Sequence, residues 1–323
     1  MHPLVGRRAL VSGGAALLAL AACSRAPGQG ATGRLRIATG NRGAVFDRYG
    51  AALAQEAAVR MPAVEPEVVR SRGSIDNVRL VLGGRAEVGF CLGDTARRAF
   101  EGDLGLDGRA DLVAVTRLYD SFLQVLVPRR SRIRTVADLG GRRVAAGQVG
   151  SGTRLVVERC LAAAGRPADA DRLVDLPLAT AVVALETGRV DALAFVSGFP
   201  VPSLVDLGER LPLRALDLGG LFPTLSARPG GEDYVAGPLP AAPYGLPEAV
   251  QTVSVKTSML TRRDLPDDLV AGFASVIYDR QTALARRAPD VRQPTLAAAV
   301  FTQPIPLHPG SMTYLRRRYA AGG

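Results

Sequence analysis

The sequence predicts an α/β protein of two lobes that face each other across a ligand cleft. The first observation is a pair of glycine loops, 36-RIATGNRG-43 and 143-RVAAGQVG-150, each placed after a short strand and before a helix. The second is the pair 81-VLGGRAEVGF-90 and 185-LETGRVDALAF-195, which share a Gly-Arg step, an acid and an apolar strand. Because α/β sheets bind ligands beyond the carboxyl ends of their strands, we expect the two glycine loops to meet at the cleft.

Length and composition allow two domains and argue against some partners. The chain has 323 residues, of which 47% are hydrophobic, so each lobe can bury a substantial core. The formal net charge is +10, but the arginines are scattered and only 5% of residues are aromatic, so we expect no nucleic-acid partner. The positive balance suits an anionic ligand or the surface of an anionic membrane.

Residues 1–23 have the pattern of a lipoprotein signal peptide. Two arginines precede the apolar stretch 9-ALVSGGAALLALAA-22, which is too short to span a bilayer comfortably. The following Cys23 completes a stretch that resembles a bacterial lipobox, in which the cysteine is lipidated and becomes the mature N-terminus. We therefore expect export and a lipid anchor on the outer face of the cell membrane, with residues 24–33 as a tether. The alternative to the lipobox is an ordinary secretory signal peptide that happens to end in cysteine. The sequence also leaves open whether export uses the Sec or the twin-arginine pathway.

Residues 34–120 and 220–323 are expected to form the first lobe. Phe46, Tyr49, Leu53 and Ala57 recur at helical spacing and predict a helix over 45–60. Strands are expected over 34–38, 67–71, 86–92 and 251–260. One further helix is expected to end near residue 84, and two others to span 94–102 and 266–284, the last one capped by Asp264. The basic tail, 303–323, is expected to pack on this lobe.

Residues 121–219 are expected to form the second lobe. The segment 112–129 reads as one extended strand that crosses between the lobes, and the Pro/Gly-rich segment 219–249 crosses back. Thr135 and Asp138 predict a capped short helix. Strands are also expected over 142–146, 190–196 and 213–218. Helices are expected over 154–164 and 200–211 and in the last part of 175–188.

The loop 147-GQVGSGT-153 has features of an anion site. A glycine turn before a helix start places free backbone N–H groups together, and the helix dipole adds partial positive charge there. Ser151 and Thr153 add hydroxyls that can cap the helix or donate to a ligand. A glycine turn that only ends a strand would produce the same pattern, so this alternative stays open.

Catalytic residue sets are missing from the sequence, so we expect a binding protein and not an enzyme. The two histidines are His2, in the signal peptide, and His308, far from any predicted cleft element. Ser151 lacks the glycine frame of a serine hydrolase, and the single lysine, Lys256, does not follow a glycine loop. We expect no cofactor and no metal. Cys91 and Cys160 are expected to be buried free thiols, with a disulfide as the alternative.

An ordered series of short motifs resembles the TAXI group of solute-binding proteins, which are receptors of certain TRAP transporters. The series covers residues from about 35 to 278 and comprises 39-TGNRGAVFDRYGAALA-54, 73-GSIDN-77, 85-RAEVGF-90 with Asp94, 117-RLY-119, 138-DLGGRRV-144, 150-GSGT-153, 188-GRVDA-192, 198-GFP-200, Tyr244 and 252-TVSV-255. The resemblance implies a type II periplasmic-binding-protein fold, with two lobes, two crossings and a small anionic solute, such as an amino acid or dicarboxylate, between them. It also implies a monomer that works with membrane transporter subunits.

The same resemblance implies a set of ligand-contacting residues. These are Thr39, Gly40, Asn41, Arg42, Gly43, Ser74, Asn77, Asp94, Gly150, Ser151, Gly152, Thr153, Gly198, Phe199 and Pro200. Arg42, Arg72 and Arg117 are the candidates for pairing with a ligand carboxylate. The chain departs from the family where Gly43-Ala44-Val45-Phe46 replaces a common Gly-Gly-x-Tyr and where Leu92 replaces a glutamine. Both departures remove polar groups and favour a less polar ligand or different contacts.

Three other functions remain as alternatives. The first is a receptor of an ABC-type transporter or a ligand sensor for a membrane kinase. The second is an enzyme on the same scaffold, and the third is an anchored protein whose cleft binds nothing. For the receptor, we expect closure about hinges near residues 119–123 and 218–222.

Overall fold

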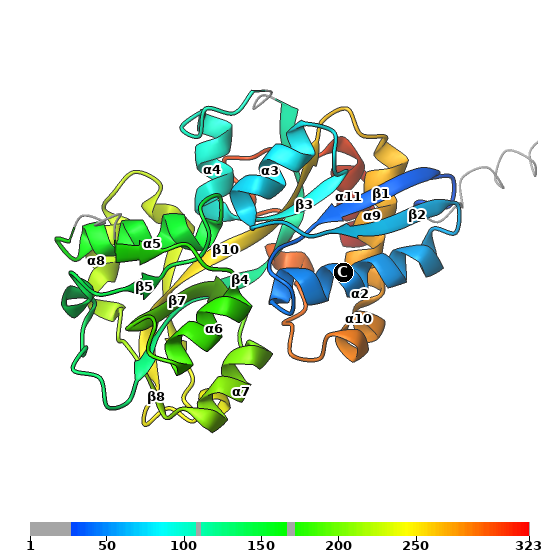
Figure 1. The fold of residues 1–323 in the computed structure, drawn as a ribbon. Coiled ribbons are helices and arrows are strands. Elements are labelled where there is room, and N and C mark those ends of the chain that lie inside the picture. Colours follow the sequence, from blue (N-terminus) through cyan, green and yellow to red (C-terminus); the bar gives the residue numbers. More distant parts are fainter. Residues whose placement is uncertain (1–26, 108–110, 167–171, 323) are drawn as a thin grey trace, which may run out of the picture.

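The computed structural model describes residues 27–107, 111–166 and 172–322, so the expected signal peptide and Cys23 lie outside the described part of the chain. In that part, one sheet of ten strands runs through the molecule in the order β2-β1-β3-β10-β4-β7-β5-β6, with β9 added to β10 and β8 to β4. Figure 1 shows two groups of helices and strands joined by the long strands β4 and β10. The predicted two-lobed α/β fold is therefore confirmed.

The first lobe has helices on both faces of a parallel set of strands. One apolar cluster lies between the strands and α2, α9 and α11, and another lies under α3 and α4. The strands are β1 (Gly33–Ala38), β2 (Val64–Val69) and β3 (Val88–Leu92). The helices are α2 (Val45–Arg60), α3 (Ser74–Leu82), α4 (Gly93–Glu101), α9 (Asp267–Asp279), α10 (Gln281–Arg287), the 3-10 turn η8 (Leu296–Ala298) and α11 (Pro309–Ala320).

The second lobe repeats this layering, with α5 on one face and α6 and α7 on the other. Its strands are β5 (Val144–Ala145), β6 (Leu173–Val174), β7 (Ala192–Ser197), β8 (Leu213–Ala215) and β9 (Tyr234–Leu239). Its helices and 3-10 turns are η3 (Val136–Leu139), α5 (Gly152–Ala163), α6 (Leu178–Glu186), α7 (Pro202–Arg210), η5 (Gly219–Leu221), α8 (Phe222–Ser226), η6 (Gly231–Asp233) and η7 (Ala242–Tyr244).

Two long antiparallel strands connect the lobes. In β4 (Leu112–Pro128), Phe122 pairs with Ser254 of β10 and also with Ser197 of β7, so the strand changes partners there. In β10 (Val250–Arg262), the first half pairs with β9 and the second half with β3. Each strand therefore belongs to both lobes, and the expected crossing in the segment 112–129 is confirmed.

The segment 219–249 lies with the second lobe, although the sequence placed it in the first. Leu225 and Tyr234 join the apolar cluster under α5, and Leu239 and Tyr244 join the cluster under α6 and α7. The return crossing is made by β10 itself. From this packing, we propose lobe boundaries near residue 121 in β4 and near residue 256 in β10.

The internal repeat predicted from the sequence has a structural counterpart in each lobe. The Nη2 atom of Arg36 donates to the Gly84 carbonyl at 2.8 Å and pairs with Glu87 at 2.7 Å. In the second lobe, Nη2 of Arg143 donates to the Gly188 carbonyl at 2.9 Å and pairs with Asp191 at 3.0 Å. In both lobes, the glycine carbonyl and the acid of the motif therefore bind the arginine of the strand that leads to the glycine loop.

Local predictions are confirmed in part. Thr135 and Asp138 form the expected capping box, and Cys91 and Cys160 are buried free thiols. The predicted cap at Asp264 is wrong, because its carboxylate pairs with Arg262 and α9 begins after Pro266. The expected helix over 266–284 is divided into α9 and α10, whereas the tail does pack on the first lobe, through α11.

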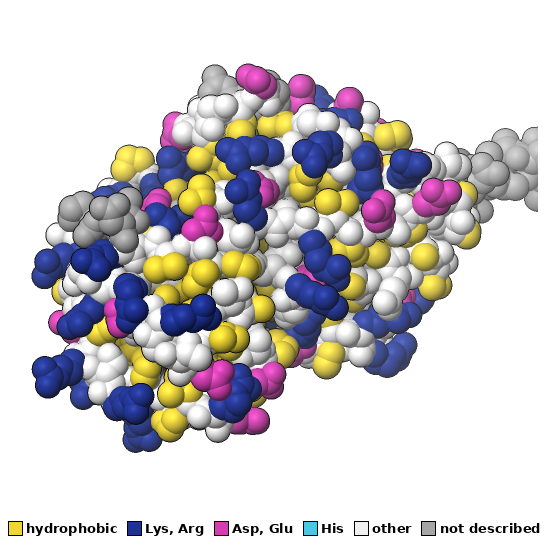
Figure 2. Space-filling view, viewed as in Figure 1, with side chains coloured by type: hydrophobic (Ala, Val, Ile, Leu, Met, Phe, Trp, Pro, Cys, Tyr) yellow, Lys and Arg dark blue, Asp and Glu magenta, His cyan; other side chains and the backbone are white. Residues whose placement is uncertain are grey.

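On the face drawn in Figure 2, the described basic side chains form no single region. Figure 2 shows lysine and arginine side chains spread over the visible face and interleaved with acidic ones. Among the described helices, none is both long and apolar enough to cross a bilayer.

Candidate functional site

The two predicted glycine loops meet where the lobes face each other. The hollow between them is lined by seven of the predicted ligand residues, Gly40, Asn41, Arg72, Ser74, Ser151, Gly152 and Thr153, together with Ala44, Phe46, Gly73, Leu92, Phe195, Val196 and Ser197. Its volume is about 30 Å³, far below the roughly 300–1,000 Å³ of typical small-molecule sites. In this arrangement the loops contact each other and leave no room for a solute.

Direct contacts across the hollow hold the lobes together. The Asp76 backbone N–H donates to the Gly150 carbonyl at 3.2 Å, and the Leu178 N–H donates to Oδ1 of Asn41 at 3.1 Å. A Cβ atom at Gly152 would lie 2.7 Å from Oγ of Ser74. The glycine at 152 therefore allows the start of α5 to approach the first lobe closely.

The hydroxyls of the second-lobe loop are already bonded within the protein. Oγ of Ser151 accepts from the Arg154 backbone N–H at 3.2 Å and caps α5. Oγ1 of Thr153 accepts from the Val196 N–H at 3.2 Å. These bonds use only the acceptor side of each hydroxyl, so they support the structural interpretation of the pattern, while donation from the O–H groups to a ligand stays a prediction.

Two polar residues of the first lobe also have internal partners. Oγ of Ser74 accepts from the Leu92 N–H at 3.1 Å. The Asn77 amide donates to the carbonyls of Thr39 and Phe90, and its oxygen accepts from Ser71. These bonds join the carboxyl ends of β1 and β3 to the start of α3, so they position the loops, and Ser74 also lines the hollow.

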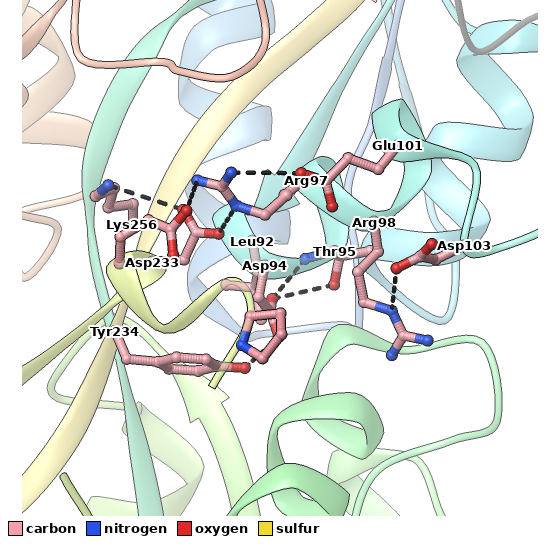
Figure 3. Close-up of polar contacts among 12 residues, drawn as sticks. Leu92, Asp94, Thr95, Arg97, Arg98, Glu101, Asp103, Asp233, Tyr234 and Lys256 are labelled. Carbon is pink, nitrogen blue, oxygen red and sulfur yellow. Dashed lines mark hydrogen bonds and ion pairs between the residues drawn. The ribbon is translucent and has the colours of Figure 1, made fainter. Parts of the chain in front are cut away.

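Asp94 belongs to a buried network that links the lobes. Its Oδ2 accepts from the Tyr234 hydroxyl at 2.7 Å, and its Oδ1 accepts from the Thr95 N–H at 2.6 Å. The neighbouring Asp233 pairs with Arg97 at 2.7 Å and lies 3.8 Å from Lys256 (Figure 3). Burial raises the pKa of Asp94, while the bonds from Tyr234 and Thr95 oppose that rise.

Apart from Arg72, the predicted residues considered next do not line the hollow between the loops. Arg42 and Gly43 are exposed, and Thr39 is buried beneath the loop. Gly150 contributes its carbonyl to the contact between lobes, and Pro200 follows the turn after β7 without lining the hollow. Arg72 lines the hollow but pairs with Asp76 at 2.9 Å.

A second and larger cavity lies between the lobes, next to the crossing strand. Its volume is about 460 Å³, within the range of small-molecule sites. Of the predicted residues, Gly198, Phe199 and Arg117 line it. The others, which the sequence did not indicate, are Val45, Leu118, Tyr119, Asp120, Phe122, Pro238, Pro240, Asp290, Val291, Arg292, Gln293, Thr295 and Ala298.

Family comparison agrees with this architecture. Residues 37–317 match the NMT1-like family. The chain belongs to this family. The match supports a periplasmic-binding-protein relationship for this NMT1-like chain, but it does not single out the TAXI group that the motifs resemble.

Solved structures of similar fold support the same conclusion. A Bordetella bronchiseptica RB50 protein is 17% identical over 88% of each chain, with a TM-score of 0.52. A protein described as a periplasmic transporter is 15% identical over 89% of this chain and 93% of its own, with a TM-score of 0.51. A Xanthomonas citri protein bound to ATP is 13% identical over 89% and 96%, with a TM-score of 0.51. At these identities the likeness establishes the two-lobed fold and not the ligand.

Proposed function

We propose that this protein is an exported, lipid-anchored receptor that binds a small anionic solute between its lobes and presents it to a membrane transporter. The observation that carries the proposal is the cavity of about 460 Å³, which residues of both lobes and of the crossing strand line together. Family membership and the two-lobed fold support it. The lipid anchor rests on Cys23 and the signal pattern of the sequence.

Lobe closure is the proposed mechanism of recognition. Only β4 and β10 run through both lobes of the described sheet, so rotation about these strands would open the cavity to solvent. A solute that contacts both lobes would favour the closed arrangement, because it gains its full set of contacts only there. The transporter would then distinguish loaded from empty receptor by the relative position of the lobes.

The class of transporter has two candidates. The motif series resembles TAXI receptors and favours a TRAP-type partner, whereas the match to the NMT1-like family favours an ABC-type partner. Uptake measured in proteoliposomes that contain the receptor and its cognate membrane subunits would distinguish them. An ABC-type partner requires ATP hydrolysis, and a TRAP-type partner requires an ion gradient.

A thermal-shift panel tests the proposed function. The full chain in detergent would be offered amino acids, dicarboxylates, monocarboxylates and sulfonates. A solute that binds only the folded protein stabilises it by about 2.7 kcal/mol at a hundredfold excess over its Kd, so the midpoint should rise with concentration. No shift with any member would contradict the receptor assignment, and turnover of a bound solute would favour an enzyme.

A further inference from the structure

Two residues that line the larger cavity carry buried hydrogen-bond donors without a partner in the described protein. Arg117 and Tyr119 of β4 both line this cavity, at a point where the pairing of β4 with β10 is irregular. Nε of Arg117 and the hydroxyl of Tyr119 are both buried without a hydrogen-bond partner. The Tyr119 residue is only 5% exposed, which makes an unpaired hydroxyl costly.

Neighbouring groups hold these donors in place. The Tyr119 ring packs edge-on against Tyr49 of α2 with 5.9 Å between ring centres, and the Tyr49 hydroxyl donates to Gln293 at 3.1 Å. Burial raises the pKa of Tyr119 well above its usual value, so the phenol keeps its proton at neutral pH. Arg48, also on α2, is a third buried group with a free donor, at Nη1.

The carboxylates on the cavity wall already have cationic partners. Oδ1 of Asp120 accepts from Nη2 of Arg117 at 2.6 Å. Asp290 pairs with Nη2 of Arg48. The unpaired groups at this end of the cavity are therefore donors, and an acceptor must come from outside the described protein.

The other part of the cavity wall is apolar. It is formed by Val45 at the start of α2, Phe122 of β4, Phe199 after β7, Pro238 and Pro240 at the end of β9, and Val291. The Phe199 ring is held by an edge-on contact with Tyr244, at 5.0 Å between centres. A second charged group placed against this surface would lose its hydration without gaining a partner.

We propose that this cavity is the solute site, and that the solute carries one oxyanion group, a carboxylate or a sulfonate, on an apolar body. The oxyanion accepts from the Tyr119 hydroxyl and from Nε of Arg117, and the apolar body lies against Phe199, Pro238 and the other apolar residues. An amino acid or dicarboxylate gains less, because the carboxylates of the wall are already paired and a second carboxylate could pair only with Arg292, which is exposed to solvent and where an ion pair contributes little. This assignment rests on the proposed receptor function and moves the site from the glycine loops to the crossing strand.

Calorimetry with defined probes tests the class of solute. The full chain in detergent would be titrated with hexanoate and hexanesulfonate, and with hexylamine, adipate and glutamate, each corrected for its heat in detergent alone. We expect the two singly charged acids to bind at least about tenfold more tightly than the other three, since a bond to a charged group contributes about 1.5–3 kcal/mol. The tighter of the two identifies the oxyanion. Tighter binding of adipate or glutamate would overturn the proposal.

Tyr119→Phe tests the location, because it removes only the hydroxyl. We expect the variant to bind the preferred acid about 10- to 100-fold more weakly. Its thermal midpoint without solute should be unchanged or higher, because a buried unpaired hydroxyl is lost; a merely structural role would instead lower it. Tyr319→Phe, at an exposed tyrosine of α11, is the matched control and should bind as the wild type does.

The two proposals can fail separately. Unchanged affinity in Tyr119→Phe, with a loss in Ser151→Ala combined with Thr153→Ala, would place the solute at the glycine loops and overturn the cavity assignment while the receptor function stands. Absence of binding by every solute of the wider thermal-shift panel would instead contradict the receptor function itself.

Discussion

Replacement of Gly152 by alanine should separate the lobes without damaging either one. Gly152 is the first residue of α5, and an added Cβ would lie 2.7 Å from both Oγ of Ser74 and Cδ1 of Leu92, across the contact between lobes. Both neighbours are almost fully buried, and Ser74 is fixed by its bond from the Leu92 N–H. Within α5 itself, alanine is at least as favourable as glycine.

The size of the effect follows from the overlap. Crowding one methyl group into a packed contact costs about 1–3 kcal/mol, and here the cost is present only when the lobes are together. The equilibrium between closed and open arrangements should therefore shift about 5- to 150-fold toward open. Solute affinity should fall by a similar factor if the solute binds only the closed arrangement.

Spin labels on the two lobes can measure this shift. Val59 of α2 and Val183 of α6 are exposed, and the native Cys91 and Cys160 are buried, so cysteines placed at 59 and 183 can be labelled selectively. Gly152→Ala should broaden the distance distribution toward longer distances. Gly220→Ala, where a Cβ meets nothing within 4 Å, is the matched control. A distribution and solute affinity unchanged by Gly152→Ala would refute closure through this contact.

Three further predictions concern the buried networks and the anchor. Tyr234→Phe removes a donor from the buried Asp94 and should cost about 1–3 kcal/mol at neutral pH. Burial already raises the pKa of Asp94, and loss of the donor raises it further in the variant, so the loss of stability should shrink as pH falls toward 3.8, the usual value. Urea titrations at several pH values would measure this loss, and a loss that does not change with pH would contradict the prediction. Glu56 is buried and accepts from Arg280 and Arg287; although burial raises its pKa, these bonds hold that pKa below the usual 4.5. The wild type should therefore have a higher free energy of unfolding than Glu56→Gln above pH 4.5, and this difference should disappear as pH falls through the lowered pKa of Glu56 in the folded protein. If the stability of both proteins falls equally in acid, the ionised carboxylate contributes nothing. Cys23→Ser should release the protein from the membrane fraction, and continued membrane association would exclude the lipid anchor.

The sequence predicted elements well where local patterns are strong. The helix over 45–60 matches α2 because four core residues fall at helical spacing before Pro62. The extended segment 112–129 matches β4 because most of its residues are apolar, many of them β-branched or aromatic, and none is glycine. The segment 219–249 was assigned to the wrong side because its proline and glycine residues give no periodicity, and its position depends on pairing between β9 and β10.

The candidate site was harder to predict, for a physical reason. Ser151 and Thr153 have side chains that suit an anion, but the hollow that they line has a volume of only about 30 Å³ because the lobes are in contact there. The larger cavity combines segments near residues 45, 119, 199, 238 and 291, which only the tertiary fold brings together. Arg117 was the one charged residue of this cavity that sequence patterns indicated.

Native mass spectrometry tests the central claim most directly. The full chain, released gently from detergent, would be measured beside Tyr119→Phe, first as purified and then with hexanoate or hexanesulfonate added. We expect one singly charged acid per wild-type chain, retained or added, and its loss from the variant under the same conditions. A bare mass for both proteins with every solute, with charge distributions typical of folded chains, would contradict the claim that this protein binds a solute between its lobes.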